Sequence, residues 1–91
     1  MIYFLKENSR YGKVKIGYSN NIKKRLESLQ VANSNELLVL LVANGGQRAE
    51  KGLHHKFKSL RVRGEWYKPA PELMKFIDEI KMAELDLTQP S

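Results

Sequence analysis

The hydrophobic pattern at the start of the chain predicts a β-hairpin. Residues 2–5 and 13–16 are rich in β-forming side chains and follow the period of two that is typical of strands. The polar residues between them have turn chemistry, so an antiparallel pair is expected. In this pairing Tyr3 lies on the same face as Lys15 and Gly17, as a direct or diagonal neighbour of Lys15.

Two further stretches have helical periodicity, and each places one charge on its apolar side. Residues 21–29 begin at an asparagine-rich N-cap, and Arg25 lies on or beside their apolar stripe. Residues 47–60 carry apolar side chains at i, i+4, i+8 and i+11, and Glu50 falls within that stripe. Taken singly, Arg25 can extend its head to solvent, and Glu50 can simply favour the start of a helix.

The rest of the pattern completes a small mixed fold. Residues 36–43 are nearly all aliphatic and predict a central strand buried on both faces. A short extended piece follows at residues 65–67, and Pro71 suits the first turn of a last helix. The order β-β-α-β-α-(β)-α predicts an α+β domain with a small three-stranded antiparallel sheet flanked by helices. The domain is expected at residues 1–82, with a C-terminal tail at residues 83–91.

Composition limits the classes of protein to which the chain can belong. Its 91 residues allow one domain. The absence of cysteine excludes disulfides and thiolate zinc sites, as is usual for a reducing compartment. No apolar run approaches the roughly 20 residues of a membrane span, and the N-terminus lacks the pattern of a signal peptide. We therefore expect a cytoplasmic location and no membrane association.

The charge is unevenly distributed. The formal net charge is +6 and the pI is about 9.7. Residues 48–68 hold seven lysines and arginines against two glutamates, which indicates a polyanionic partner, although a solvated surface would look similar. The cations expected to contact a phosphate backbone are Lys51, Lys56, Lys58, Arg61 and Arg63.

Five short features occur in order along the chain. They are Ile-Tyr at residues 2–3, Lys-Ile-Gly at residues 15–17, Arg25, Glu50, and Gly-Glu-Trp-Tyr at residues 64–67. This ordered set resembles the GIY-YIG nuclease superfamily, and most closely its small phage and bacterial branch with a Lys-Ile-Gly second motif. The resemblance covers roughly residues 1 to 80, and the order of elements is that of the family's core.

The resemblance implies a role for each matched residue. Tyr3 matches the general base for the attacking water, and Lys15 stands where many members have a second tyrosine. Gly17 matches the glycine that allows backbone and phosphate to approach closely. Arg25 matches the arginine that binds the scissile phosphate, and Glu50 matches the sole protein ligand of a hydrated divalent metal ion.

These roles are chemically consistent with one another. A tyrosine base working near neutral pH needs its pKa of about 10 lowered by roughly 2–3 units, and Lys15 is placed to lower it. One carboxylate with water and substrate oxygens suits Mg²⁺ or Mn²⁺, and an arginine fork suits phosphate. The sequence therefore predicts a metal-dependent endonuclease that acts on DNA, and double-stranded DNA is the expected substrate. Because one such site cuts one strand, double-strand cleavage calls for a homodimer or a partner protein.

Several departures from the family pattern keep other functions open. Met1 replaces the glycine that normally precedes Ile-Tyr, and the late asparagine of some branches is missing. Tyr18 and His54 are the candidates for the role of the family histidine. A module of the same fold that binds nucleic acid without cutting it is the first alternative. The second is a protein-interaction domain whose basic face meets an acidic partner.

Overall fold

Strand β1 (Ile2–Glu7) pairs on both sides and carries the most buried part of a five-stranded antiparallel sheet. The structure is a computed structural model that describes residues 1–88, and the end of the expected tail, residues 89–91, lies outside the described residues. Strands β2 (Val14–Tyr18) and β3 (Leu37–Ala43) flank β1. Strands β5 (Trp66–Tyr67) and β4 (Arg61–Arg63) extend the sheet beyond β2, giving the order β3-β1-β2-β5-β4. The predicted α+β class is confirmed.

The register of the first hairpin places Tyr3 opposite Gly17 and Leu5 opposite Lys15. Lys15 is therefore the diagonal neighbour of Tyr3, one of the two arrangements that the sequence allowed. Side chains alternate between the faces of a strand. Tyr3 and Leu5 consequently lie on one face, and Phe4 and Ile16 lie on the other.

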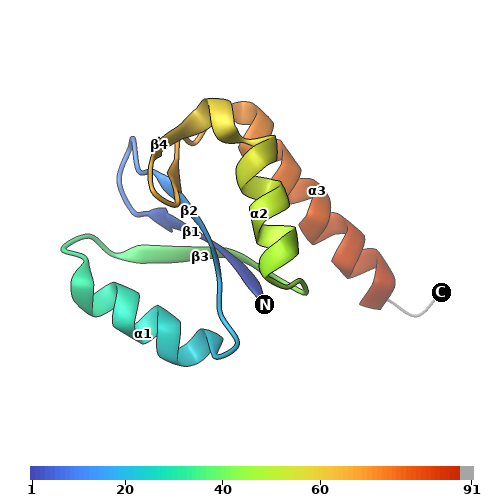
Figure 1. Ribbon diagram of the computed structural model, residues 1–91, viewed down its shortest axis with the longest axis horizontal. Helices are drawn as coiled ribbons and strands as arrows, with labels where there is room; N and C mark the ends of the chain where they lie inside the picture. Colours follow the sequence, from blue (N-terminus) through green and yellow to red (C-terminus); the bar gives the residue numbers. More distant parts are fainter. Residues whose placement is uncertain (89–91) are drawn as a thin grey trace.

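Three helices cover the two faces of the sheet (Figure 1). Helix α1 (Ile22–Ala32) lies on one side, where Leu26 and Leu5 line a shared apolar groove with β3. Helices α2 (Gln47–Lys56) and α3 (Pro71–Thr88) lie on the other side. There Phe4, Ile16 and Val14 pack in the main core with residues of α3 and the end of α2, namely Phe57, Leu73 and Ile77. None of the helices in residues 1–88 combines the length and the apolar character that a membrane span requires.

Two expectations about the sheet are wrong. The sheet has five strands rather than three, because the chain after α2 folds into a second hairpin, β4 and β5. Within residues 1–88, strand β3 is an edge strand that pairs only with β1, and not a central strand buried on both faces. Leu38 and Val39 on β3 remain 38% and 52% exposed. An aliphatic run shows that a segment tends to form a strand, but it does not fix the strand's place in the sheet.

The helix boundaries differ from the expected ones in two places. Helix α1 begins as predicted, with the Asn21 side chain accepting a hydrogen bond from the Lys24 backbone, but it continues to Ala32 rather than ending at Leu29. Helix α2 ends at Lys56, and a short 3₁₀ turn, η1 (Lys58–Leu60), replaces the predicted last turn. This tighter turn leads the chain directly into β4. Helix α3 begins at Pro71, as expected from the proline.

Candidate active site

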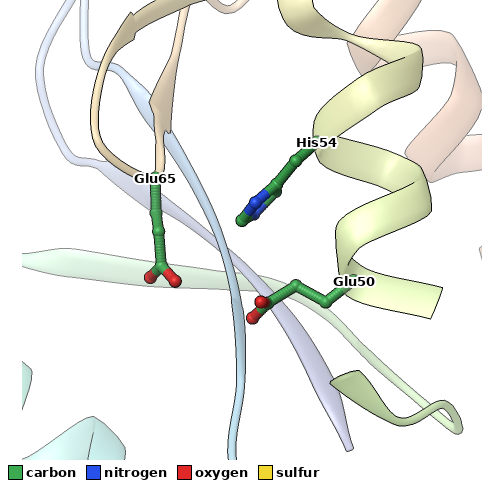
Figure 2. A group of neighbouring side chains, drawn as sticks. All are labelled: Glu50, His54 and Glu65. Carbon is green, nitrogen blue, oxygen red and sulfur yellow. The ribbon is translucent and has the colours of Figure 1, made fainter. Parts of the chain in front are cut away.

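Glu50, His54 and Glu65 converge at the edge of β2 (Figure 2). One donor atom from each side chain lies within 4.8 Å of the other two. Glu50 and His54 are four residues apart on α2 and therefore share one face of the helix. Glu65 comes from the turn between β4 and β5, so it reaches the site only because the second hairpin folds back beside β2.

The backbone of Ile16 fixes two of these three residues. The Ile16 N–H donates to the backbone oxygen of Glu65 at 3.0 Å, and the Ile16 carbonyl accepts a hydrogen bond from Nε2 of His54 at 2.9 Å. Both groups belong to the edge of β2 that faces β5. Because β5 pairs with β2 only at Val14 and Lys15, this edge is open beyond Ile16. The cluster occupies that opening.

Lys15 contacts the cluster through Glu65. Its Nζ lies 3.3 Å from Oε1 of Glu65 and 5.1 Å from the centre of the Trp66 ring. The Lys15 side chain is only 14% exposed, so this ion pair is partly shielded from water. The lysine that was predicted to face Tyr3 is thus engaged by a carboxylate.

Tyr3 is almost fully buried, at 2% exposure, with its ring against the backbone of Gly17. Burial raises the pKa of the Tyr3 phenol above its ordinary value, and the charge of Glu65 raises it further. Arg25 lowers this pKa and Glu50 raises it. The net direction is opposite to the one predicted, and Lys15 is not among the causes. The structure pairs Lys15 with Glu65, and the activation of Tyr3 by Lys15 stays a prediction.

The two carboxylates of the cluster also oppose each other. Burial raises the pKa of Glu50, and the neighbouring charge of Glu65 adds to this effect. The groups that lower the pKa of Glu50 are His54 in its protonated form, then Lys15 and Lys51. Burial is the largest of these effects, so the net rise reflects mainly the loss of water around the Glu50 carboxylate.

Tyr67 is a part of the site that sequence reasoning missed. Its side chain is buried, and its hydroxyl makes no hydrogen bond with any residue that the structure describes. Its ring stacks at a tilt on His54, with centres 5.6 Å apart. Burial raises the pKa of Tyr67, Arg61 lowers it, and the carboxylates of Glu65 and Glu50 raise it. These effects place the unpaired hydroxyl in the field of the two glutamates.

Glu65 was also missed as a functional residue. It lies in the Gly-Glu-Trp-Tyr run that supports the family resemblance, and it is one of two acidic residues in the basic stretch of residues 48–68. A glutamate isolated among lysines and arginines was the feature of the sequence that could have identified Glu65 as functional. His55, next to His54, is exposed and turned away, as expected for adjacent helix positions.

The other predicted residues lie around the cluster at different distances. Arg25 is exposed on α1, where it lines a shallow pocket with Asn21 and Lys24, and its charge reaches Tyr3. Tyr18 stands opposite Ile2 in the hairpin and is partly exposed. By strand alternation it lies on the face opposite to Tyr3. Of the two candidates for the role of the family histidine, His54 is the one found in the cluster.

The predicted phosphate-binding cations do not form one group. All five are exposed: Lys51, Lys56, Lys58, Arg61 and Arg63. The charges of Lys51 and Arg61 act on Glu50 and Tyr67 respectively, which places both near the cluster. The ammonium of Lys56 instead lies over the Phe76 ring of α3, 5.3 Å from its centre. Of these five cations, Lys51 and Arg61 are the two whose charges act on residues of the site.

Comparison with known proteins gives one family. The family model of the T5orf172 domain matches residues 1–82. No curated protein and no solved structure matches the chain.

Proposed function

Because this chain belongs to the T5orf172 domain family, a nuclease-associated family, we propose that it is a metal-dependent endonuclease domain that hydrolyses DNA phosphodiester bonds in the manner of GIY-YIG nucleases. The observation that carries the proposal is the convergence of Glu50, His54 and Glu65 at the open edge of β2, in electrostatic contact with Tyr3. Paired carboxylates with an imidazole are a donor set that suits a divalent cation.

The residues present fit such a cation. The carboxylates of Glu50 and Glu65 lie close together, and burial and the charge of Glu65 raise the pKa of Glu50. The buried hydroxyl of Tyr67 lacks a hydrogen-bond partner among the described residues. Buried polar groups are normally satisfied, and an unpaired one is often explained by a bound ion or water. Bound at Glu50, Mg²⁺ or Mn²⁺ would supply Lewis-acid stabilisation of the charge that develops on the phosphate.

The side chains of the chain itself provide the remaining functions. Tyr3, as the phenolate, accepts the proton of the attacking water, whose oxygen forms the new bond to phosphorus as the bond to the leaving sugar oxygen breaks. That oxygen takes a proton from bulk water. Arg25 is exposed and presents a planar fork of donors to the phosphate. A cation bound at the cluster would balance the charges of Glu50 and Glu65, which are two of the causes that raise the pKa of Tyr3. The phenol of Tyr3 would then lose its proton more easily.

The DNA partner is expected to be double-stranded, held through phosphate contacts of the exposed cations near the cluster, Lys51 and Arg61. A single site cuts one strand. Double-strand cleavage would therefore need two copies of the domain or a partner protein.

Nicking of supercoiled plasmid with Mg²⁺ or Mn²⁺ tests the proposal. We expect wild type to nick and both Glu50→Ala and Tyr3→Phe to lose at least about 100-fold in rate, the usual scale for loss of one transition-state contact. Glu79→Ala and Tyr11→Phe are matched controls, because both residues are exposed and Tyr11 is 78% exposed. Equal nicking by wild type and Glu50→Ala would refute the enzymatic function.

One observation favours a second function, a module that binds nucleic acid without cutting it. Tyr3 is buried and its pKa is raised, which is unfavourable for a general base in the protein without a cation. This alternative predicts salt-sensitive DNA binding that survives Glu50→Ala, with no cleavage under any divalent metal.

A further inference from the structure

The His54 side chain is held in an orientation that leaves one ring nitrogen free. Its Nε2 lies 2.9 Å from the carbonyl oxygen of Ile16. A carbonyl oxygen only accepts hydrogen bonds, so Nε2 carries the proton. In the neutral ring the lone pair is then on Nδ1. A metal-binding histidine almost always donates its other N–H to a carbonyl or carboxylate in this way, because that bond fixes the tautomer and the ring orientation.

Glu65 also retains a free donor atom. Oε1 lies 3.3 Å from Lys15, whereas its backbone is anchored by the hydrogen bond from Ile16. The second carboxylate oxygen is thus available, on a side chain that is 39% exposed and can adjust. One donor atom from each of the three side chains lies within 4.8 Å of the other two, and either ring nitrogen of His54 counts as a donor. Two ligands at about 2.1 Å from one cation are at most about 4.2 Å apart, so a small side-chain rotation closes the site.

The unpaired hydroxyl of Tyr67 is an independent sign of a ligand. Tyr67 is fully buried, and its ring stacks on that of His54. A buried hydroxyl without a partner among the described residues costs roughly 1–3 kcal/mol. A water molecule held by a cation at the cluster would satisfy it.

We propose that Glu50, His54 and Glu65 together form a three-ligand metal centre that prefers a first-row transition ion such as Mn²⁺ to Mg²⁺. The inference rests on the proposed function only in taking Glu50 as a metal ligand, and it departs from the single-carboxylate site that the resemblance implies. Mg²⁺ binds oxygen ligands and keeps most of its water. Imidazole nitrogen shifts the preference of a site toward transition ions.

Binding of Mn²⁺ and Mg²⁺ to the metal-free full chain, measured by titration calorimetry, tests the preference. We expect wild type to bind one Mn²⁺ at least about tenfold more tightly than Mg²⁺. Glu65→Gln should lower the affinity for both ions by about 10–100-fold, which is the range found when even a residue that only supports a metal ligand is lost. His54→Gln should reduce the affinity for Mn²⁺ more than the affinity for Mg²⁺. His55→Gln and Glu79→Gln, at exposed positions on α2 and α3, should change neither affinity.

Pulsed electron paramagnetic resonance of bound Mn²⁺ provides a first readout from wild type alone, before any variant is made. In wild type we expect coupling to a directly bound imidazole nitrogen, and this coupling should persist in His55→Gln and disappear in His54→Gln. Bound Mn²⁺ without nitrogen coupling in wild type, or unchanged affinity in Glu65→Gln, would overturn the three-ligand centre. So would equal affinities of wild type for the two ions.

The two proposals fail in different ways. Nicking activity with Mg²⁺ together with Mn²⁺ that shows no nitrogen coupling would overturn the three-ligand centre and leave the nuclease function intact. Mn²⁺ binding with the expected coupling but no nicking would support the centre and refute the nuclease function.

Discussion

The phenol ring of Tyr3 lies directly against the backbone of Gly17, its partner on the neighbouring strand. A Cβ atom at Gly17 would overlap the Cζ and hydroxyl atoms of Tyr3. Gly17 is therefore required because the ring occupies the space above it. The resemblance implied that this glycine admits a phosphate. The contact that the structure records is with the proposed general base.

This contact predicts a large difference between two glycine substitutions. Gly17→Ala must displace the Tyr3 ring, and we expect it to lower the free energy of unfolding by about 1–3 kcal/mol and to reduce nicking. Gly52→Ala is the control, because Gly52 lies in α2 with nothing within 4 Å of an added Cβ. Gly52→Ala should raise the free energy of unfolding by about 0.4–1 kcal/mol. Urea unfolding measures both, and equal effects would contradict the packing of Tyr3 on Gly17.

The charge conflict at Glu50 predicts that its neutralisation stabilises the metal-free protein. The pKa of Glu50 is raised by burial and by Glu65, so the folded state binds this proton more tightly than the unfolded state. The cost of ionisation is absent below the unfolded pKa of about 4.3. It develops as the pH rises through the raised folded pKa and persists above it.

Thermal unfolding of Glu50→Gln in chelator should therefore show a higher Tm than wild type at pH 7 and a smaller difference near pH 4. Saturating Mn²⁺ should reverse the order, because only wild type keeps the ligand. The matched variant is Glu79→Gln, at an exposed position on α3, which should show no such pH-dependent gain. A Glu50→Gln protein that is less stable than wild type in chelator would contradict the charge conflict.

The Lys15–Glu65 ion pair predicts opposite effects of one substitution on binding and on cleavage. Lys15→Gln removes a cation 3.3 Å from a proposed metal ligand. We expect metal affinity to rise by up to about tenfold, or about 1.4 kcal/mol, because repulsion is lost and Glu65 is released. The nicking rate should fall, because Lys15 stands where many members of the family have the second tyrosine. Lys13→Gln, at an exposed position two residues earlier, is the control for both measurements.

Arg25 should be needed for cleavage but not for folding. It is exposed on α1, so its removal leaves the core intact. We expect Arg25→Ala to lower the nicking rate at least about 100-fold, with Tm unchanged, and Arg25→Lys to restore part of it. Lys23→Ala, on the same helix, should retain the wild-type rate. A large fall in Tm for Arg25→Ala would show instead that the residue is structural.

The basic residues should separate into two groups in DNA binding. Lys51→Ala and Arg61→Ala should each reduce the slope of log affinity against log salt by about 0.9, the value for one phosphate contact. Lys56→Ala should leave the slope unchanged, since its ammonium lies over Phe76 rather than near the cluster. Fluorescence anisotropy at several salt concentrations measures the slopes. Equal slopes for all three variants would show that phosphate binding does not follow the cluster.

Local pattern was sufficient for the elements and for part of the site. Alternation in the hairpin gave the shared face of Tyr3, Lys15 and Gly17, and the register made Lys15 the diagonal neighbour of Tyr3. The N-cap at Asn21 and the proline at residue 71 marked two helix starts correctly. These features depend on residues close in the chain, whose geometry is set by the periods of strands and helices.

The pairing of distant segments was not visible in the sequence. The aliphatic run of β3 looked like a buried central strand, yet β1 takes that position. The short β4–β5 hairpin has too few residues for a strand pattern, although it delivers both Glu65 and Tyr67 to the site. Its place beside β2 depends on hydrogen bonds such as that from Ile16 to Glu65, which join residues far apart in the chain.

The sequence by itself therefore determined the fold class, the first hairpin, and the charges of Arg25 and Glu50 on or beside apolar helix faces. Only the tertiary structure decided that Glu65 and His54 meet Glu50, and that Lys15 pairs with Glu65. The physical reason is the distance along the chain over which each effect acts. Propensity and periodicity act within one element, whereas electrostatic partners are chosen by whichever groups packing brings within a few ångströms.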